Sequence, residues 1–548
     1  MKNVVFLYAG ATETHAFDVL FDGKSAFSRC LDWVRSVKDC VAVRVATVPS
    51  LEPHVKQCLR DAALENAVVI CNPEWNTASL IEAVASNVSS AGADTVVYAA
   101  GDRPFLDMKL TEQLLENHVS YLAEYTFADG YPLGLAPEIV DKGTLAILSS
   151  LAKDKARAAG DAPVSANSLF SIIQSDINAF EIETVIAPRD YRMLRLDFSC
   201  SNKARTLACE ALYREAKAAS VPFEAEPLSE LASSSAAVQA TVPAFYTLQI
   251  AQNVASVPVY NPYIDAFKKK NGVRPVVAEN SSPADMDFGK FETLIDDIAR
   301  FSETAVISLS GFTEPLTVPH FLDYVACVLK KSGLSVLIET DGLLVTPELA
   351  QRVAQIASNS PARTGEWPAV MWIVSVDAVS EAMYRSVRPE SVSCTDGLSP
   401  FKTACSAVAT LAACFPGCVY PQFMRMDTNE SELESFYRFY NDSNSPSAGK
   451  LIIQKYDSYC GVLPDKKSAD LSPLERMPCW HIKRDIFVFP DGSVPLCREH
   501  ILDGSVGNIF NDGLEKIWAG FASVVKSHLD GQYYEKCRNC DEYYTFNF

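Results

Sequence analysis

Four cysteines near the end of the sequence have the residue type and the spacing of a metal site. They are Cys479, Cys497, Cys537 and Cys540. The last two form a Cys-x-x-Cys pair, whose thiolates can bind one metal centre from a single turn of the chain. Two further thiolates complete a four-thiolate site of the kind that zinc and iron–sulfur clusters use. The sequence therefore predicts a metal centre in the tail.

The segment that leads to the second cysteine indicates how the first two meet. Residues 485–497 predict a β-hairpin, because two alternating apolar runs flank an Asp491-Gly492 pair that favours a tight turn. Such a turn would return Cys497 towards Cys479. We therefore expect a hairpin to deliver one half of the ligand set and the Cys-x-x-Cys pair to deliver the other.

Spacing alone does not separate zinc from an iron–sulfur cluster. A four-cysteine zinc ribbon would use the same thiolates. A mixed zinc set is a further alternative, in which His500 joins Cys497, Cys537 and Cys540. The type of metal is left open by the ligand spacing itself.

The residues around the cysteines resemble the short, four-cysteine form of the SPASM domain, which follows the barrel in many radical-SAM enzymes. The resemblance is carried by Pro478-Cys479-Trp480, the 490–497 segment, Gly507-Asn508-Ile509, Ile517-Trp518 and the final Cys-x-x-Cys. It implies that residues 471–548 form a SPASM domain. It also implies one [4Fe–4S] cluster on Cys479, Cys497, Cys537 and Cys540.

The composition of the chain limits the number of domains, the kinds of partner and the compartment that we expect. The chain has 548 residues, a hydrophobic content of 48% and a net charge of −20. This length suggests three or four domains, and the acidic balance argues against nucleic acid as a partner. Its 16 cysteines show no regular framework outside the tail, which favours a reducing, cytoplasmic compartment. The longest uncharged run, 231–264, is rich in Ser and Gln and broken by prolines, so we expect no membrane span.

Most of the chain alternates apolar strands with amphipathic helices, as in α/β proteins. We expect an α/β domain over 1–195, with strands at 3–8, 41–48, 67–71 and 95–99. Residues 196–240 are expected to form a helix (202–219) and an Ala/Ser-rich linker. A second α/β region over 241–470 has expected strands at 245–250, 305–309, 335–339, 370–376, 418–424 and 450–455.

The first domain resembles the sugar-nucleotide cytidylyltransferases and their relatives of GT-A fold. The residues that carry this resemblance are the first strand, the 21–25 segment and Gly101-Asp102-Arg-Pro in the 96–106 segment. It implies that Asp102 holds a divalent metal such as Mg²⁺ together with nucleotide phosphates. The loop at 9–15 departs from the family, because it has one glycine, an acid and no basic residue to offset a triphosphate.

The middle region resembles a radical-SAM core, which implies a partial (β/α) barrel. The matching segments are 308–316, 336–342, 372–378 and 422–426. Glu314 occupies the position of the Glu-Pro strand end that supports S-adenosylmethionine in working members. Thr313 replaces a glycine of that motif.

The loop after the first barrel strand lacks the ligands of the radical-generating cluster. The family requires Cys-x-x-x-Cys-x-x-Cys there, because three thiolates leave one iron open for S-adenosylmethionine. Alignment of this motif on the chain puts Val254, Pro258 and Asn261 at the three cysteine positions. The resemblance therefore implies a barrel without that cluster, and binding of S-adenosylmethionine is not expected.

Taken together, the chain looks like the spirochaete-type SPASM proteins. The first hypothesis is an iron–sulfur protein that uses its tail cluster for electron transfer, for scaffolding, or to bind a protein, peptide or small molecule. The alternative is a Mg²⁺-dependent nucleotidyl- or glycosyltransferase that acts around Asp102. An unorthodox radical-SAM enzyme and a zinc-stabilised structural protein are further alternatives, and enzyme activity itself is left open.

Overall fold

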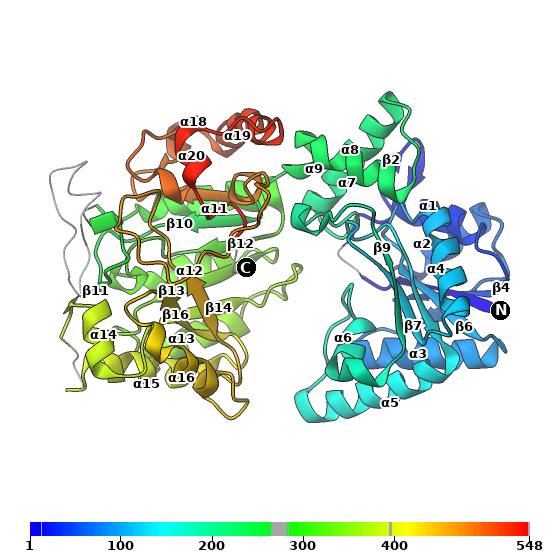
Figure 1. Cartoon of the computed structure of the whole chain (residues 1–548), viewed down its shortest axis with the longest axis horizontal. Coiled ribbons are helices and arrows are strands. Elements are labelled where there is room, and N and C mark those ends of the chain that lie inside the picture. The colour runs from blue at the N-terminus through cyan, green and yellow to red at the C-terminus, as the bar shows by residue number, and fades with distance from the viewer. Residues whose placement is uncertain (12–13, 265–281, 283, 394–396, 546–548) are drawn as a thin grey trace. The chain divides into compact units, whose positions relative to one another are not determined.

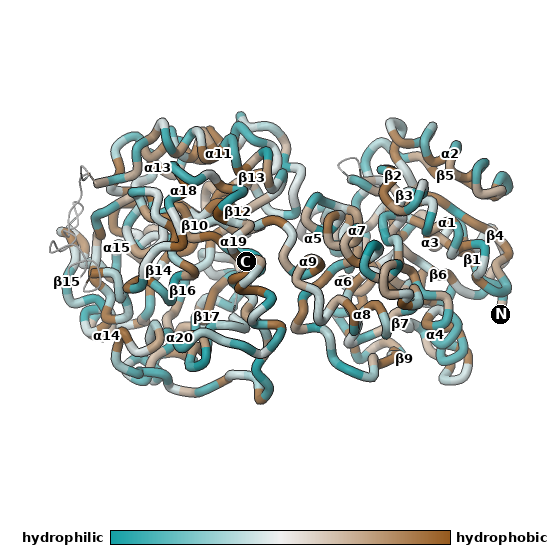
Figure 2. The backbone as a smooth tube through the Cα atoms, turned by 90° about the horizontal axis from the view of Figure 1, so that it is seen from above, coloured by the Kyte–Doolittle hydropathy of each residue, from teal (hydrophilic) through white to brown (hydrophobic). Residues whose placement is uncertain are grey.

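A computed structural model describes residues 1–11, 14–264, 282, 284–393 and 397–545. The chain divides into two compact units, Met1–Thr241 and Val242–Phe548 (Figure 1). Hydrophobic residues recur along the strands of both units (Figure 2). Among the described residues, no helix is both long and apolar enough to cross a membrane.

A seven-stranded mixed sheet forms the centre of the first unit, in the order β5-β4-β1-β6-β8-β7-β9. Its strands are β1 (Asn3–Ala9), β4 (Cys40–Thr47), β5 (Val68–Cys71), β6 (Thr95–Ala100), β7 (Tyr125–Asp129), β8 (Glu138–Asp141) and β9 (Ile182–Ile186). β2 (Val19–Phe21) and β3 (Lys24–Ser25) form a separate small ladder. The four strands expected in this region are confirmed to within one residue at each end.

Helices cover both faces of this sheet, so its strands are buried on both sides. Along β1, Val5 and Leu7 join one hydrophobic core, whereas Val4 and Phe6 join the other. This follows from the period of two along a strand, which sends neighbouring side chains to opposite faces. The helices are α1 (Ala26–Val34), α2 (Glu52–Asp61), α3 (Thr77–Ser90), α4 (Met108–Ser120), α5 (Lys142–Ala159) and α6 (Phe170–Ile173), with 3₁₀ turns at Gln174–Ala179 (η1) and Arg192–Leu194 (η2).

Three further helices belong to the first unit. α7 (Lys203–Ala218) confirms the helix expected at 202–219, and its N-cap Asn202 accepts from the Arg205 N–H. The segment expected as a linker forms α8 (Ala225–Ser234) and α9 (Ala236–Gln239). Leu228 and Val238 of these helices are buried in the core of the first unit. The Ala/Ser-rich composition therefore reflects close helix packing.

The second unit is a half-barrel built on a seven-stranded sheet of parallel strands. The strand order is β17-β16-β14-β13-β12-β10-β18. The strands are β10 (Phe245–Leu248), β12 (Ala305–Ser308), β13 (Leu334–Thr340), β14 (Val370–Ser375), β16 (Val419–Arg425), β17 (Ile452–Lys455) and β18 (Asp485–Val488). The first six confirm the strands expected from the sequence. β11 (Ser256–Val257) and β15 (Glu390–Ser391) pair outside this sheet.

Helices follow the strands in chain order and pack against this sheet. They are α11 (Phe288–Ser302), α12 (Phe321–Leu329), α13 (Pro347–Ser358), α14 (Glu381–Val387), α15 (Pro400–Cys414) and α16 (Glu430–Tyr440), with a 3₁₀ turn η3 (Pro315–Thr317) after β12. Alternation of parallel strands and helices is the expected consequence of right-handed crossover connections. The carboxyl ends of the strands consequently meet along one rim.

The predicted hairpin is present as a tight turn, in which the Phe489 N–H donates to the Ser493 carbonyl at 3.0 Å, but the strands on either side of the turn pair with other segments. β18 pairs in parallel with β10, from Phe245 opposite Asp485 to Leu248 opposite Val488. β19 (Ser493–Val494) pairs instead with β20 (Gly507–Asn508). The turn at Asp491-Gly492 is present, with a positive φ of 84° at Gly492. The period-two pattern located the strand residues, but their pairing depends on a distant edge strand that no local signal reveals.

The rest of the tail is helical. It contains α17 (His481–Arg484), η4 (Arg498–His500), α18 (Ile509–Asp512), α19 (Leu514–Leu529) and α20 (Glu535–Asn539). Ile517, Trp518 and Phe521 of α19 are buried. α19 packs against α17 of the tail and against α11 of the half-barrel.

Candidate metal centre and barrel cavity

The structure brings the four predicted tail cysteines together around one cavity. Cys479 lies just before α17, and Cys497 immediately precedes η4. Cys537 lies within α20, and Cys540 is the residue that ends it. Three separate short segments therefore deliver the four thiols to one place.

Burial controls the chemistry of these thiols. It raises the pKa of Cys479 to about 12 and the pKa of Cys537 to about 11, and it raises the pKa of Cys497 as well. A buried thiol resists ionisation in an apolar surrounding, but a bound metal deprotonates a coordinating thiol outright. The cavity therefore favours four thiolates only together with a compensating positive charge.

Arg476 lines the cavity and fixes the backbone of the Cys-x-x-Cys segment. Its guanidinium donates to the carbonyl oxygen of Cys537 at 2.5 Å and also to that of Cys540. The same guanidinium lies 4.0 Å from the centroid of the Tyr543 ring. Charge-assisted hydrogen bonds to two carbonyls and a cation–π contact hold the backbone that carries both thiols.

Three histidines also line the cavity, namely His481, His500 and His528. His500, named in the mixed-zinc alternative, has its Nε2 3.7 Å from Cys537 Sγ and its Nδ1 2.6 Å from Asp503. His528 is buried, and its Nδ1 accepts from the Cys479 N–H at 3.4 Å. Its Nε2 has no hydrogen-bond partner among the described residues. A neutral imidazole in this arrangement carries its hydrogen on Nε2.

Sequence reasoning missed a fifth cysteine at this site. Cys460 follows β17 by five residues and lines the same cavity as the other four. No ligand spacing connects Cys460 to the tail motif, so the sequence alone does not distinguish it from the other cysteines outside the tail. Its position at the end of a predicted barrel strand was the available signal, since such ends face the functional rim of a parallel sheet.

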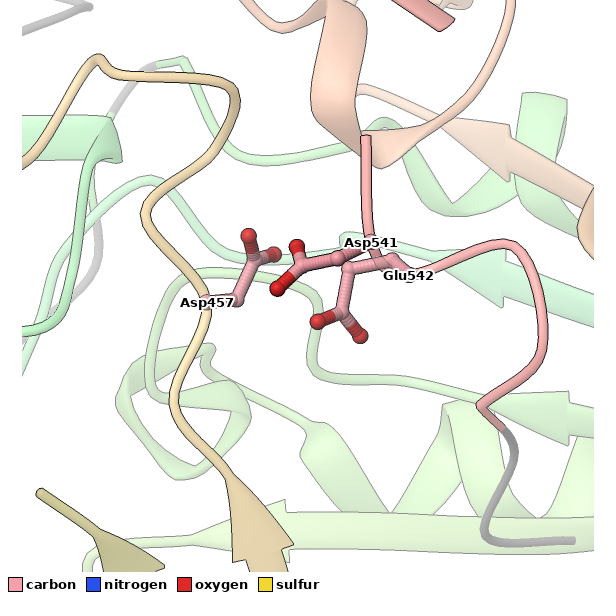
Figure 3. A group of neighbouring side chains, drawn as sticks. All are labelled: Asp457, Asp541 and Glu542. Carbon is pink, nitrogen blue, oxygen red and sulfur yellow. The ribbon is translucent and has the colours of Figure 1, made fainter. Parts of the chain in front are cut away.

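Three carboxylates converge beside this cavity. Asp457, Asp541 and Glu542 point toward one another within 4.8 Å, from the loop after β17 and from the end of the chain (Figure 3). Lys455 lies 2.9 Å from Asp541 and pairs with Glu542, and Lys467 lies 2.8 Å from Asp541. Two ammonium groups therefore already balance this acidic group, which acts as an ion-pair network.

A cavity with a largely polar lining lies along the rim of the half-barrel. Val254, Pro258 and Asn261, the positions of the missing cluster cysteines, all line it. Asn261 donates through Nδ2 to the Phe312 carbonyl at 2.8 Å. Tyr260 donates to Asp377 at 2.7 Å. Side chains of the loop itself thus make the contacts that hold it on the barrel.

Arg388 ties this loop to the strand ends. Its guanidinium pairs with Asp377 at 2.8 Å and with Asp341, which follow β14 and β13. It also donates to Ser256 Oγ at 2.6 Å and to the Tyr260 hydroxyl. The Arg388 and Asp377 side chains are 1% and 0% exposed. The sequence matches had included Asp341 and Asp377, but Arg388 lies outside every matched segment.

Glu314 is occupied by internal contacts. Its Oε2 accepts from Thr340 Oγ1 at 3.0 Å and from the Asp341 N–H at 2.9 Å, and its Oε1 accepts from the Leu316 N–H at 3.2 Å. Burial and the nearby Asp341 raise its pKa to about 8. Thr313 donates to the Ala251 carbonyl at 2.9 Å. This strand end therefore braces the rim of the barrel.

The barrel cavity and the cysteine cavity have lining residues in common. Arg498 and Glu542 line both the barrel cavity and the cysteine cavity. Arg498 also donates to the Tyr459 hydroxyl, and Tyr459 lines the barrel cavity. A metal centre on the tail cysteines would consequently be separated from a barrel ligand by these side chains.

The first unit places Asp102 at the end of β6, with its pKa raised to about 6, mainly by burial. Its Oδ1 has no hydrogen-bond partner among the described residues, and neither has Oδ1 of Asp197. Asp197 also pairs with Arg205 at 3.3 Å and contributes to the raised pKa of Asp102. No sequence motif indicates Asp197. Thr12 and Glu13 of the 9–15 loop lie outside the described residues.

Comparison with known proteins supports a metal-binding role for the segment that carries the four tail cysteines. Residues 479–541 match the model of the SPASM family, an iron–sulfur cluster-binding domain. An uncharacterized protein of Treponema pallidum (strain Nichols) is 42% identical over 381 residues, which cover 69% of this chain and 98% of the relative. The cysteine site and the family match together define an iron–sulfur cluster-binding domain of the SPASM family in the tail. The chain belongs to the same family as the Treponema pallidum protein.

Solved structures similar to each half are more distant. A cytidylyltransferase from Leptospira borgpetersenii has 14% identity and a TM-score of 0.32, with 39% of this chain and 86% of that chain covered. A structure of BtrN in complex with AdoMet and 2-DOIA has 15% identity and a TM-score of 0.33, with 55% of this chain and 94% of that chain covered.

Proposed function

We propose that this protein carries one [4Fe–4S] cluster on Cys479, Cys497, Cys537 and Cys540 and uses it for electron exchange with a ligand held in the barrel cavity. The observation that carries the proposal is the shared wall of Arg498 and Glu542 between the two cavities. When bound, the cluster supplies one-electron chemistry. The chain's own residues bind the cluster, hold the loop and shape the cavity that would receive the ligand.

The spacing of the thiols supports a cluster over a single zinc ion. A tetrahedral zinc site with Zn–S bonds of about 2.3 Å brings its sulfurs to roughly 3.8 Å from one another. Among the described residues, only Asp457, Asp541 and Glu542 converge within 4.8 Å as a group of three or more potential ligands. No three of the described cysteine sulfurs lie within 4.8 Å of one another, which supports a larger inorganic group between them.

The barrel is proposed to work without cleavage of S-adenosylmethionine. Val254, Pro258 and Asn261 offer no thiolate. Arg388, with Asp341 and Asp377, stabilises the loop through ion pairs and hydrogen bonds in the part of the rim that the loop covers. Glu314 has its acceptors engaged by the chain itself. The cavity that remains is lined mainly by polar side chains, which suits a small polar molecule or a peptide.

The test is a measurement of iron, sulfide and zinc per chain after anaerobic purification and reconstitution, with an electron paramagnetic resonance spectrum of the reduced protein. About four irons and four sulfides, with a spectrum that S-adenosylmethionine does not change, are expected. About eight irons and a spectrum that shifts with S-adenosylmethionine would overturn the proposal that the barrel works without cleavage of S-adenosylmethionine. One zinc without iron would overturn the cluster.

A second function is favoured by the pair of aspartates in the first unit. We propose that Asp102 and Asp197 bind Mg²⁺ with a nucleotide, because each has a buried carboxylate oxygen without a hydrogen-bond partner among the described residues. Paired carboxylates with free oxygens suit a hard cation that retains water ligands. Calorimetric titration of CTP with and without Mg²⁺ tests this proposal. Binding that requires Mg²⁺ and is lost in Asp102→Asn supports it, and absence of binding refutes it.

A further inference from the structure

We propose that Cys460 is an alternative ligand of the tail cluster that can replace Cys540. The inference rests on the proposed four-cysteine cluster and extends it to a fifth thiol. In the exchange, Cys460 loses its proton and binds the iron that Cys540 leaves, and the released Cys540 thiolate takes up a proton. No electron is transferred and no further reactant is needed.

The position of Cys460 in the cavity is the first observation. It lines the cavity together with all four predicted ligands. Its Sγ lies 3.7 Å from the carbonyl oxygen of Lys536, in α20, the helix that also contains Cys537. The thiol of Cys460 therefore contacts the backbone of the segment that carries the Cys-x-x-Cys pair.

Among the four ligands, Cys540 is the one that Cys460 approaches. The hydrogen-bonding contact between these two thiols is the largest cause of the raised pKa of Cys540, ahead of burial. The raised pKa values of Cys479 and Cys497 have other causes, including the charge of Cys540 itself. Cys540 is therefore the ligand at which we place the exchange, because the two thiols are already in hydrogen-bonding contact.

The loop holds Cys460 in an uncommon conformation. Tyr459 and Cys460 have φ values of 51° and 53°, in the left-handed region that non-glycine residues rarely adopt. The Tyr459 N–H donates to Asp457 at 2.7 Å, and the Tyr459 hydroxyl accepts from Arg498. Strain of this kind persists where surrounding contacts impose it, and here those contacts turn Cys460 toward the cavity.

A buried histidine in the same cavity also indicates that the cavity binds a hydrogen-bond acceptor. His528 is 1% exposed and lines the cavity, and its Nε2 has no hydrogen-bond partner among the described residues. A buried donor left without an acceptor costs free energy, so such groups point to a bound partner. Thiolate and sulfide are acceptors of this kind, and both are present when a cluster is bound.

The test compares the iron content and the electron paramagnetic resonance spectrum of four reconstituted full-length variants with those of the wild type. They are Cys460→Ala, Cys540→Ala, the double variant Cys460→Ala/Cys540→Ala, and Cys537→Ala. Cys405→Ala is the matched control, since this half-buried thiol of α15 does not line the cysteine cavity. Its iron content should equal that of the wild type.

Each single variant at Cys460 and Cys540 should retain about four irons, with an altered spectrum in Cys540→Ala. The double variant should lose most of its iron, and so should Cys537→Ala, because the proposed exchange takes place at Cys540 alone. Loss of iron from Cys540→Ala as complete as that from the double variant would overturn the inference. A wild type without iron would instead refute the proposed cluster itself, so the two failures are distinguishable.

Discussion

The guanidinium of Arg388 and the carboxylate of Asp377 lie 2.8 Å apart, and both side chains are almost completely removed from solvent. Asp377 also accepts from the Tyr260 hydroxyl, and Arg388 also donates to Ser256. Two strand ends and the loop at 252–261 therefore meet in one hydrogen-bonded ionic network. In this barrel the network makes the contacts on which the conformation of the loop depends.

Replacement of Arg388 should be strongly destabilising. Arg388→Ala would leave Asp377 buried without its cation, which typically costs about 3–5 kcal/mol in the free energy of unfolding. Urea unfolding monitored by tryptophan fluorescence measures this loss. Arg385→Ala is the control, because Arg385 is 71% exposed and pairs with Glu381 on the surface, where the cost is about 1 kcal/mol or less. Equal effects of the two substitutions would contradict the network's role.

Glu314 should make stability depend on pH. Burial and the charge of Asp341 raise its pKa from 4.5 to about 8. Between these values the native state binds a proton that the unfolded state lacks, so this contribution is complete below pH 4.5 and is lost as pH rises through 8. Glu314→Gln should flatten the fall in unfolding free energy over this range. The exposed Glu434→Gln should leave the slope as in the wild type, and an unchanged slope in Glu314→Gln would refute the prediction.

Gly492 should be difficult to replace. Its φ is +84°, and a Cβ added there would lie 2.2 Å from a ring carbon of Phe510. Gly513 has a similar φ of +83° with nothing within 4 Å of an added Cβ. Both alanine variants incur backbone strain, but only Gly492→Ala also displaces a neighbour, at an extra cost of about 1–3 kcal/mol. Thermal unfolding of the two reconstituted variants checks this order, and a less stable Gly513→Ala would reverse it.

Arg476 should stabilise the tail through the backbone of its metal-binding segment. Arg476→Gln removes the cation that donates to the carbonyls of Cys537 and Cys540 and stacks on Tyr543. Hydrogen bonds from charged groups contribute about 1.5–3 kcal/mol each, so residues 533–545 should become less protected from hydrogen exchange. Arg438→Gln, on the exposed face of α16, is the comparison variant. Equal protection of the tail in the two variants would show that Arg476 is dispensable.

The sequence predicted the strands better than their partners. β12, β13 and β14 were located to within a residue or two because each is a short, continuous apolar run between helical segments. β18 was located as well, but its pairing with β10 joins residues far apart in the sequence. Local patterns specify which residues are extended, whereas pairing depends on which edge is free in the folded sheet.

The candidate site was predicted unevenly for a similar reason. The four tail cysteines have a spacing that is typical of metal binding, and the structure places all four around one cavity. Cys460, Arg388 and Asp197 carry no spacing signal. Each reaches its site from another segment, and only the three-dimensional contacts of the fold identify it. Thr12 and Glu13, which belong to the loop at 9–15, lie outside the described residues.

The pairing of β18 with β10 has a consequence for folding during synthesis. The ribosome makes β10 early and β18 only after almost the whole half-barrel has been translated. Until then the nascent sheet has an unpaired edge at β10, and exposed edges of this kind promote pairing with other chains. Closure of that edge brings in the segment between Cys479 and Cys497. Late arrival of the tail thus ends the interval in which the nascent barrel is prone to aggregate and begins the interval in which iron and sulfide can be inserted.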